Sequence, residues 1–211
     1  MTEPDVTLTD YGLAAECALL AYLVGRLDRP RAALRQRFVL FFGSAGLAAL
    51  LGGTVHGFFL DPTTASARLL WPATLLAVGL SALAAWAIGA RMQFTGAVAR
   101  RLEAVAAVEW LAYALAVVLG GAQAFAFVIL NYLPAAVFLF VAFVLAYRRT
   151  GAQPLLVGTL GLVGTFVAAA VQYGRLALHP VYMNHNALYH VIQAGALLLL
   201  YQGARAARER C

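Results

Sequence analysis

The chain has 211 residues, of which 63% are hydrophobic and 11% are charged, and its formal net charge is +6 at pH 7. Soluble domains carry about 25% charged residues, so this composition excludes a soluble globular protein and indicates an integral membrane protein. All fifteen basic residues are arginine. The absence of lysine excludes rhodopsin-type retinal chemistry, which needs a lysine amine for its Schiff base.

Seven apolar stretches are predicted, each near the roughly 20 residues that an α-helix needs to cross a membrane. In chain order they are Thr9–Leu27, Gln36–Phe59, Leu69–Ala90, Leu102–Gly120, Ala122–Tyr147, Pro154–Gly174 and His185–Gly203. A hairpin turn at Gly120 and Gly121 divides the fourth from the fifth, because the undivided run is about twice one crossing. We therefore expect an all-α, seven-transmembrane helix bundle that forms a single domain over residues 1–211.

The first stretch is preceded by the acidic segment MTEPDVTLTD. A secretory signal peptide begins with a basic segment, so we expect no cleavage here and keep the first stretch as a helix. Cys17 lies within that stretch and Cys211 is the last residue. The two thiols are predicted to lie too far apart for a disulfide.

The arginines predict the orientation of the bundle. Two of them, Arg68 and Arg175, fall on one side of the predicted membrane. Thirteen fall on the other side: Arg26, Arg29, Arg31, Arg35, Arg37, Arg91, Arg100, Arg101, Arg148, Arg149, Arg205, Arg208 and Arg210. Because short cytoplasmic connections are rich in arginine, we expect the N-terminus outside and the C-terminus in the cytoplasm.

Topology and anionic membrane lipids then explain the net positive charge, and no nucleic-acid partner is expected. The use of arginine alone, together with the richness in alanine, indicates a bacterial protein, so we expect the bacterial inner membrane. Membrane lipids and a lipid-like small molecule are the expected partners. Whether the chain forms a homo-oligomer is left open.

Polar side chains within the predicted spans are candidate functional residues, because a charge at the membrane centre costs roughly 2.5–3.5 kcal/mol. His56 lies near the end of the second stretch and His190 near the start of the seventh, so both reach the same outer third. Asn186, His190 and Gln193 recur on one helix face. The predicted pocket opens outward and contains Glu16, His56, Gln172, His185, Asn186 and His190, with Gln172, Asn186 and Gln193 as substrate-binding residues.

Three histidines could hold a metal in this pocket. His56, His185 and His190 supply the three protein ligands of a zinc site with one open position, where a bound water can attack an ester or amide. His185 and His190 lie five residues apart, about 140° around an ideal helix. His185 therefore reaches the pocket only if the first helical turn is irregular, and otherwise Asn186 faces the pocket.

Other polar residues favour structural roles. His179 precedes Pro180 in a connection and is predicted to be structural. Glu109 is expected to be a buried carboxyl that bonds a neighbouring helix. Ala45, Ala49 and Gly52 form a face of small residues that allows close helix approach.

The motifs GGTVHGFF and NHNALYHVIQ, with seven spans and an outside N-terminus, resemble the superfamily of alkaline ceramidases, adiponectin and progestin receptors and related seven-helix membrane hydrolases. The resemblance implies that His56, His185 and His190 bind zinc and that a fatty acid is released from a lipid amide or ester. The superfamily's helix-2 serine is Gly52 here, and its helix-3 aspartate has no counterpart. Glu16 or Asp61 would then act as general base or orient a ligand.

Two other functions stay open at this stage. The pocket of a non-catalytic sensor or transporter would hold a lipid, a small ligand or a metal. Alternatively, His56 and His190 would ligate haem in an electron-transfer protein.

Overall fold

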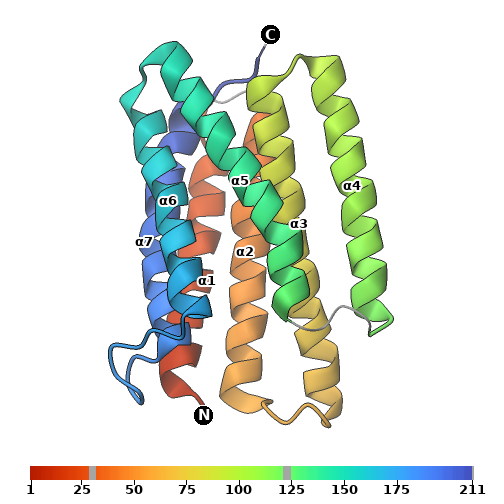
Figure 1. Ribbon diagram of the computed structural model, residues 1–211, viewed down its shortest axis with the longest axis vertical. Coiled ribbons are helices and arrows are strands. Elements are labelled where there is room, and N and C mark those ends of the chain that lie inside the picture. Colours follow the sequence, from red (N-terminus) through yellow and green to blue (C-terminus); the bar gives the residue numbers. More distant parts are fainter. Residues whose placement is uncertain (29–31, 121–124, 211) are drawn as a thin grey trace.

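The computed structural model describes residues 1–28, 32–120 and 125–210, and within these residues the chain forms seven α-helices and no strand (Figure 1). The helices are α1 (Pro4–Gly25), α2 (Ala32–Phe58), α3 (Ala65–Gln93), α4 (Gly96–Val118), α5 (Phe125–Thr150), α6 (Gln153–Tyr173) and α7 (His185–Ala206). Consecutive helices run in opposite directions, so the two termini lie at opposite ends of the bundle. We name these ends the N-terminal end and the C-terminal end. The expected all-α class is confirmed.

Five of the described helices are long and apolar enough to cross a membrane, namely α1, α2, α3, α5 over Phe127–Thr150, and α6. The other two, α4 and α7, carry more polar residues in their sequences. In α4 these include Arg100, Arg101, Glu103 and Glu109, and in α7 they include His185, Asn186, His190 and Gln193. The composition of the bundle is therefore compatible with membrane insertion, as expected.

Six helices form a closed ring. Each of α1, α2, α3, α5, α6 and α7 packs against the next, and α7 returns to α1. α4 packs against α3 and lies at the edge of the bundle (Figure 1). Tyr113 of α4 donates a hydrogen bond from its hydroxyl to the carbonyl of Leu75 in α3, at 3.3 Å. The seven helices are thus not equivalent, because only six of them can surround a central space.

Each predicted stretch corresponds to one helix, although the ends differ. α1 begins at Pro4, five residues earlier than expected, and proline suits this first turn because its missing N–H needs no partner there. α4 ends just before Gly120, whose φ of 80° is in the left-handed region that favours glycine. The rest of the predicted hairpin turn, Gly121, lies outside the described residues, as do Arg29, Arg31 and Cys211.

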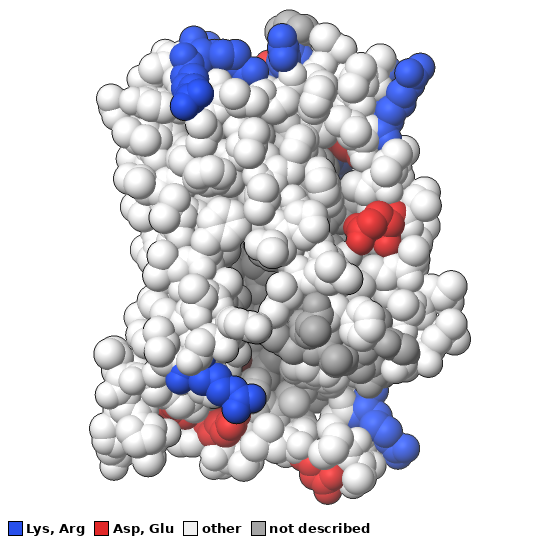
Figure 2. Space-filling view, in the orientation of Figure 1, with Lys and Arg blue, Asp and Glu red and all other residues white. Residues whose placement is uncertain are grey.

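Arginine side chains lie toward the two ends of the bundle, and the face between them is mostly uncharged apart from one acidic patch at about mid-height, on the side of α4 (Figure 2). The described members of the larger arginine group all lie at or beside helix termini at the C-terminal end. Glu103 of α4 forms ion pairs there with Arg37 of α2, at 2.9 Å, and Arg91 of α3, at 2.6 Å. One carboxylate therefore ties three helices together at this end.

Glycines on α2 allow α1 to approach closely. A Cβ atom at Gly53 would lie 2.7 Å from Cβ of Asp10, and one at Gly46 would lie 2.9 Å from Cβ of Cys17. The small face predicted for this role, which includes Ala45 and Ala49, lines a central cavity instead. The expectation is corrected in this respect, because α1 packs against the adjacent strip of α2.

We predict that Gly53→Ala destabilises the bundle, since the added methyl group overlaps Asp10 and Tyr11 of α1. Overpacking of this kind costs about 1–3 kcal/mol. Gly43→Ala is the matched control, because a Cβ atom at that position of α2 meets nothing within 4 Å. Thermal unfolding in detergent should show a lower midpoint for Gly53→Ala and an unchanged or higher one for Gly43→Ala. Equal midpoints for the two variants would contradict the close approach.

Candidate functional site

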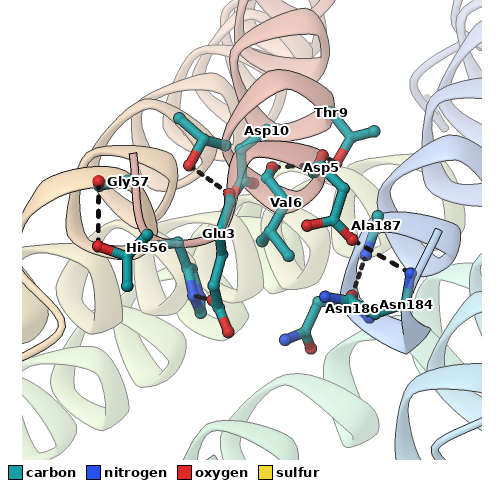
Figure 3. A network of polar contacts seen from close by, with 12 residues as sticks. Glu3, Asp5, Val6, Thr9, Asp10, His56, Gly57, Asn184, Asn186 and Ala187 are labelled. Atoms are coloured by element: carbon teal, nitrogen blue, oxygen red, sulfur yellow. Dashed lines mark hydrogen bonds and ion pairs between the residues drawn. The ribbon is translucent and has the colours of Figure 1, made fainter. Parts of the chain in front are cut away.

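The first turn of α1 is joined to the end of α2. Nδ1 of His56 pairs with a carboxylate oxygen of Glu3, and the backbone N–H of Thr2 donates to the carbonyl of Gly57 at 2.9 Å. Figure 3 shows the start of α1 between these α2 residues and the beginning of α7. Nε2 of His56 has no hydrogen-bond partner among the described residues. His56 is therefore held through one nitrogen and leaves the other available.

The same turn of α1 also fixes the start of α7. The side-chain oxygen of Asn184 accepts hydrogen bonds from the backbone N–H groups of Asn186 and Ala187, at 2.9 and 3.1 Å. The backbone N–H of Asn184 donates to Asp5 at 3.2 Å (Figure 3). This is an N-cap, which satisfies donors that the helix itself cannot satisfy. The cap makes the first turn of α7 regular from His185 onward.

A second histidine lies deeper, between α1 and α7. Nε2 of His190 lies 3.1 Å from Oδ1 of Asp10, and Nδ1 of His190 lies 3.2 Å from the hydroxyl of Thr9. The side chains of His190 and Asp10 are only 12% and 5% exposed. Both ring nitrogens of His190 are thus engaged, and the pair bridges two helices in apolar surroundings.

These groups border a cavity of about 480 Å³ inside the six-helix ring. Its walls are largely apolar and include Phe41, Ala49, Trp71 and Leu197. Apart from Trp71, the residues with polar side-chain groups that line it are Asp10, His56, Thr74, Ser81, Tyr132, Thr165, Gln172, Tyr173, Asn186, Tyr189, His190 and Gln193. All six ring helices contribute to the lining, and α4 does not. The cavity can therefore hold a molecule with a large apolar part and a smaller polar part.

Two side-chain amides in the cavity are incompletely bonded. Gln172 donates from its amide nitrogen to the side-chain oxygen of Asn186, and Gln193 donates to the hydroxyl of Thr165 at 3.3 Å. The side-chain oxygens of Gln172 and Gln193 are buried and have no partner among the described residues. A buried acceptor without a partner is costly, so a donor on a bound molecule would stabilise these oxygens once the amides turn toward the cavity.

The structure brings five of the predicted site residues to one cavity: His56, Gln172, Asn186, His190 and Gln193. His185 does not line it, because the capped first turn of α7 is regular and presents Asn186 instead. Glu16 does not line it either, and one buried oxygen of its carboxyl has no partner among the described residues. The prediction that these side chains come together is therefore confirmed for five residues and wrong for Glu16 and His185.

Asp61 is also outside the cavity, in the connection between α2 and α3, where it is fully exposed. Thr63 donates to it from the side-chain hydroxyl at 2.7 Å and from the backbone N–H at 2.9 Å. These hydrogen bonds lower the pKa of Asp61 below its usual value. A carboxylate with a lowered pKa is a weaker base, so neither its position nor its chemistry suits the role of general base.

Two of the structural roles agree with the sequence argument. Asn131 of α5 donates a hydrogen bond to Glu109 of α4, so the expected bond to a neighbouring helix is present, but Glu109 is exposed rather than buried as expected. Nδ1 of His179 accepts hydrogen bonds from the backbone N–H groups of Val181 and Tyr182, at 3.2 and 3.1 Å. His179 therefore stabilises its own turn.

The arrangement of the histidines bears on metal binding. Within the described residues, no group of three His, Cys, Asp or Glu side chains could hold a metal ion. His190 would have to give up its contact with Asp10 or with Thr9 to become a ligand. The residues as arranged therefore do not fit a zinc centre with three histidines, nor axial haem ligation by His56 and His190.

Sequence reasoning missed the acidic partners of the histidines. Glu3 and Asp10 belong to the acidic segment MTEPDVTLTD, whose charge was used only to argue against a signal peptide. The start of α1 at Pro4 turns most of this segment into helix. Thr9 and Asp10 lie four and five residues after Asp5. In a helix this spacing places the three side chains within one half of the helix surface, so the sequence contained a signal for a polar helix face.

The fold and site define a helical bundle with helices suited to a membrane and a partly polar cavity inside a ring of six helices. A model of a family of unknown function (DUF6962) matches residues 6–209, and the chain belongs to this family. No curated protein and no solved structure matches the chain.

Proposed function

We propose that this protein binds a small, amphipathic molecule in its central cavity. The observation that carries the proposal is the pair of buried side-chain oxygens, from Gln172 and Gln193, that have no partner among the described residues. Both amides line the cavity. When a side-chain amide turns toward the cavity, a ligand with a hydroxyl or amine group would donate a hydrogen bond to its oxygen and remove the cost of leaving that oxygen unpaired.

The dimensions of the cavity support a small molecule. Its volume of about 480 Å³ is in the range of ligand-binding pockets, which is roughly 300–1,000 Å³. Apolar walls surround most of the space, and the side-chain amides that line it all lie on α6 and α7. The ligand would place its apolar part against α2, α3 and α5 and its donor group toward α6 and α7.

We also propose that all seven helices cross the membrane, with the N-terminus outside and the C-terminus in the cytoplasm of a bacterium. α7 completes the ring although its hydropathy is low, since Asn186, His190 and Gln193 line the cavity rather than face lipid. The excess of arginine at the C-terminal end supports this orientation.

Binding is tested with three probes that share one apolar body, namely 4-phenylbutan-1-ol, 4-phenylbutylamine and butylbenzene. Trp71 lines the cavity, so tryptophan fluorescence in nanodiscs reports binding, corrected for partition into empty nanodiscs. We expect the alcohol and the amine to bind about tenfold more tightly than butylbenzene, the value of one added hydrogen bond. Gln193→Leu should remove this preference.

Gln202→Leu is the matched control for this experiment. Gln202 lies on the same helix, outside the cavity, and its side-chain oxygen accepts a hydrogen bond from Arg205 at 2.9 Å. The control should keep the preference of the wild type. If none of the probes binds, or if both variants lose the preference equally, the proposed binding site is wrong.

Zinc-dependent hydrolysis of a lipid amide or ester is the rival proposal. It is supported by the presence of His56 and His190 at one cavity and by the Glu3 carboxylate behind His56. A carboxylate on the second nitrogen is the usual support of a zinc-bound histidine. The engaged nitrogens of His190 count against it, as does the position of His185 outside the cavity.

Elemental analysis of purified protein separates the two proposals. We expect less than one zinc per chain, with the same content in His56→Ala and His190→Ala. His179→Ala is the control, since this histidine lies in the connection before α7. One zinc per chain that is lost in both site variants and kept in the control would favour the hydrolase. A Soret band in the visible spectrum would favour haem.

A further inference from the structure

A second hollow lies at the C-terminal end of the bundle. Its volume is about 500 Å³. It is bordered by the ends of α3, α5 and α7, the start of α6 and the segment that follows α7. We call that segment, residues 207–210, the C-terminal strap. Four arginines line the hollow: Arg149, Arg205, Arg208 and Arg210.

Backbone hydrogen bonds hold the strap against the bundle. The N–H of Arg210 donates to the carbonyl of Arg91 at 3.0 Å, and the backbone N–H of Leu34 donates to the carboxylate of Glu209 at 2.9 Å. These contacts attach the strap to the end of α3 and the start of α2. The wall of the hollow that the strap provides is therefore fixed in position.

Three of the four arginines are positioned by uncharged acceptors. The guanidinium of Arg149 donates to the side-chain oxygen of Gln93 at 2.7 Å and to the carbonyl of Met92 at 3.0 Å. Arg210 donates to the carbonyl of Gln93 at 2.8 Å, and Arg205 donates to Gln202 at 2.9 Å. These hydrogen bonds orient the side chains without neutralising their charge.

The fourth, Arg208, is exposed and makes no hydrogen bond or ion pair with the described residues. Glu209, the one acid among the described residues that line the hollow, accepts a hydrogen bond from Leu34 and lies 3.7 Å from Arg91. The nearby carboxylate of Glu103 is engaged by Arg37 and Arg91. Glu103 and Glu209 thus pair with other arginines, and no described acid forms an ion pair with the four arginines of the hollow.

We propose that this hollow binds a phosphate group. Four guanidinium groups around one space repel one another, and an anion between them replaces repulsion with attraction. The planar guanidinium matches a phosphate through paired N–H donors. Ala146, Leu155 and Met92 provide an apolar floor beside the arginines, which suits the carbon atoms attached to the phosphate.

The phosphate can come from an anionic lipid headgroup or from a soluble phosphate compound. The end of a membrane-spanning bundle lies at headgroup level, where both sources are present. This site is separate from the central cavity, because no residue lines both spaces. A negative result for the phosphate site would therefore leave the ligand binding proposed for the central cavity untouched, and the reverse also holds.

The test measures binding of phosphatidylglycerol, phosphatidylcholine and glycerol 3-phosphate to the full chain in detergent, by native mass spectrometry and by thermal unfolding. We expect phosphatidylglycerol to bind at least tenfold more tightly than phosphatidylcholine, because the choline ammonium of phosphatidylcholine neutralises its phosphate and repels the arginines. Arg205→Gln combined with Arg208→Gln should remove this preference, and a higher salt concentration should weaken it. Competition by glycerol 3-phosphate would identify a soluble ligand, and its absence would identify the lipid; both outcomes support the phosphate site.

Arg148→Gln is the matched control. Arg148 is exposed at the same end of α5, next to Arg149, but does not line the hollow. Unfolding midpoints without ligand confirm that the variants fold, and Arg208 has no described bond to lose. Equal affinity for the two lipids in the wild type, or an equal loss in Arg148→Gln and the double variant, would overturn the proposal.

Discussion

The ring of six helices closes where α1 packs against α7, and contacts between polar side chains join these two helices. Asp10 contacts His190 at 3.1 Å, and Asp5 accepts from the backbone of Asn184 at 3.2 Å. Asp10 and His190 are largely buried, and polar groups in apolar surroundings are stable only when bonded, so each of these two residues needs its partner. Gly53 seats Asp10 closely against α2 on the other flank of α1. Asp10 is therefore held from two sides, and α7 must present His190 to it.

The central cavity follows from this arrangement. When His190 faces α1, Asn186 and Gln193 on the same face of α7 also turn toward the interior. Across the ring, α2 presents Ala45, Ala49 and other small residues to the same space. Small side chains on one wall and polar side chains on the other leave a volume that the chain does not fill. α4 lies outside the ring and cannot fill it.

Hydropathy predicted the seven helices because composition alone decides whether a segment is apolar, and it placed His56 and His190 at one depth because helical rise is constant. Hydropathy could not predict that α4 lies outside the ring, since an average over a segment does not say which face of the helix the apolar side chains occupy. Nor could it assign His185, whose position depends on the N-cap at Asn184. The acidic partners were missed for a related reason. Asp10 looks like a solvated residue until a neighbouring helix supplies its histidine.

The two ends of the bundle use charge in opposite ways. At the N-terminal end, three acids each contact a histidine or a helix cap on another helix: Glu3, Asp5 and Asp10. These contacts join α1 to α2 and α7. At the C-terminal end, Glu103 and Glu209 neutralise arginines between α2, α3 and α4, but the arginines there exceed the acids. Neutral carbonyl and amide groups orient part of this excess. A bundle built in this way is closed by matched pairs at one end and keeps organised positive charge at the other, so its two ends differ in the chemistry they can bind.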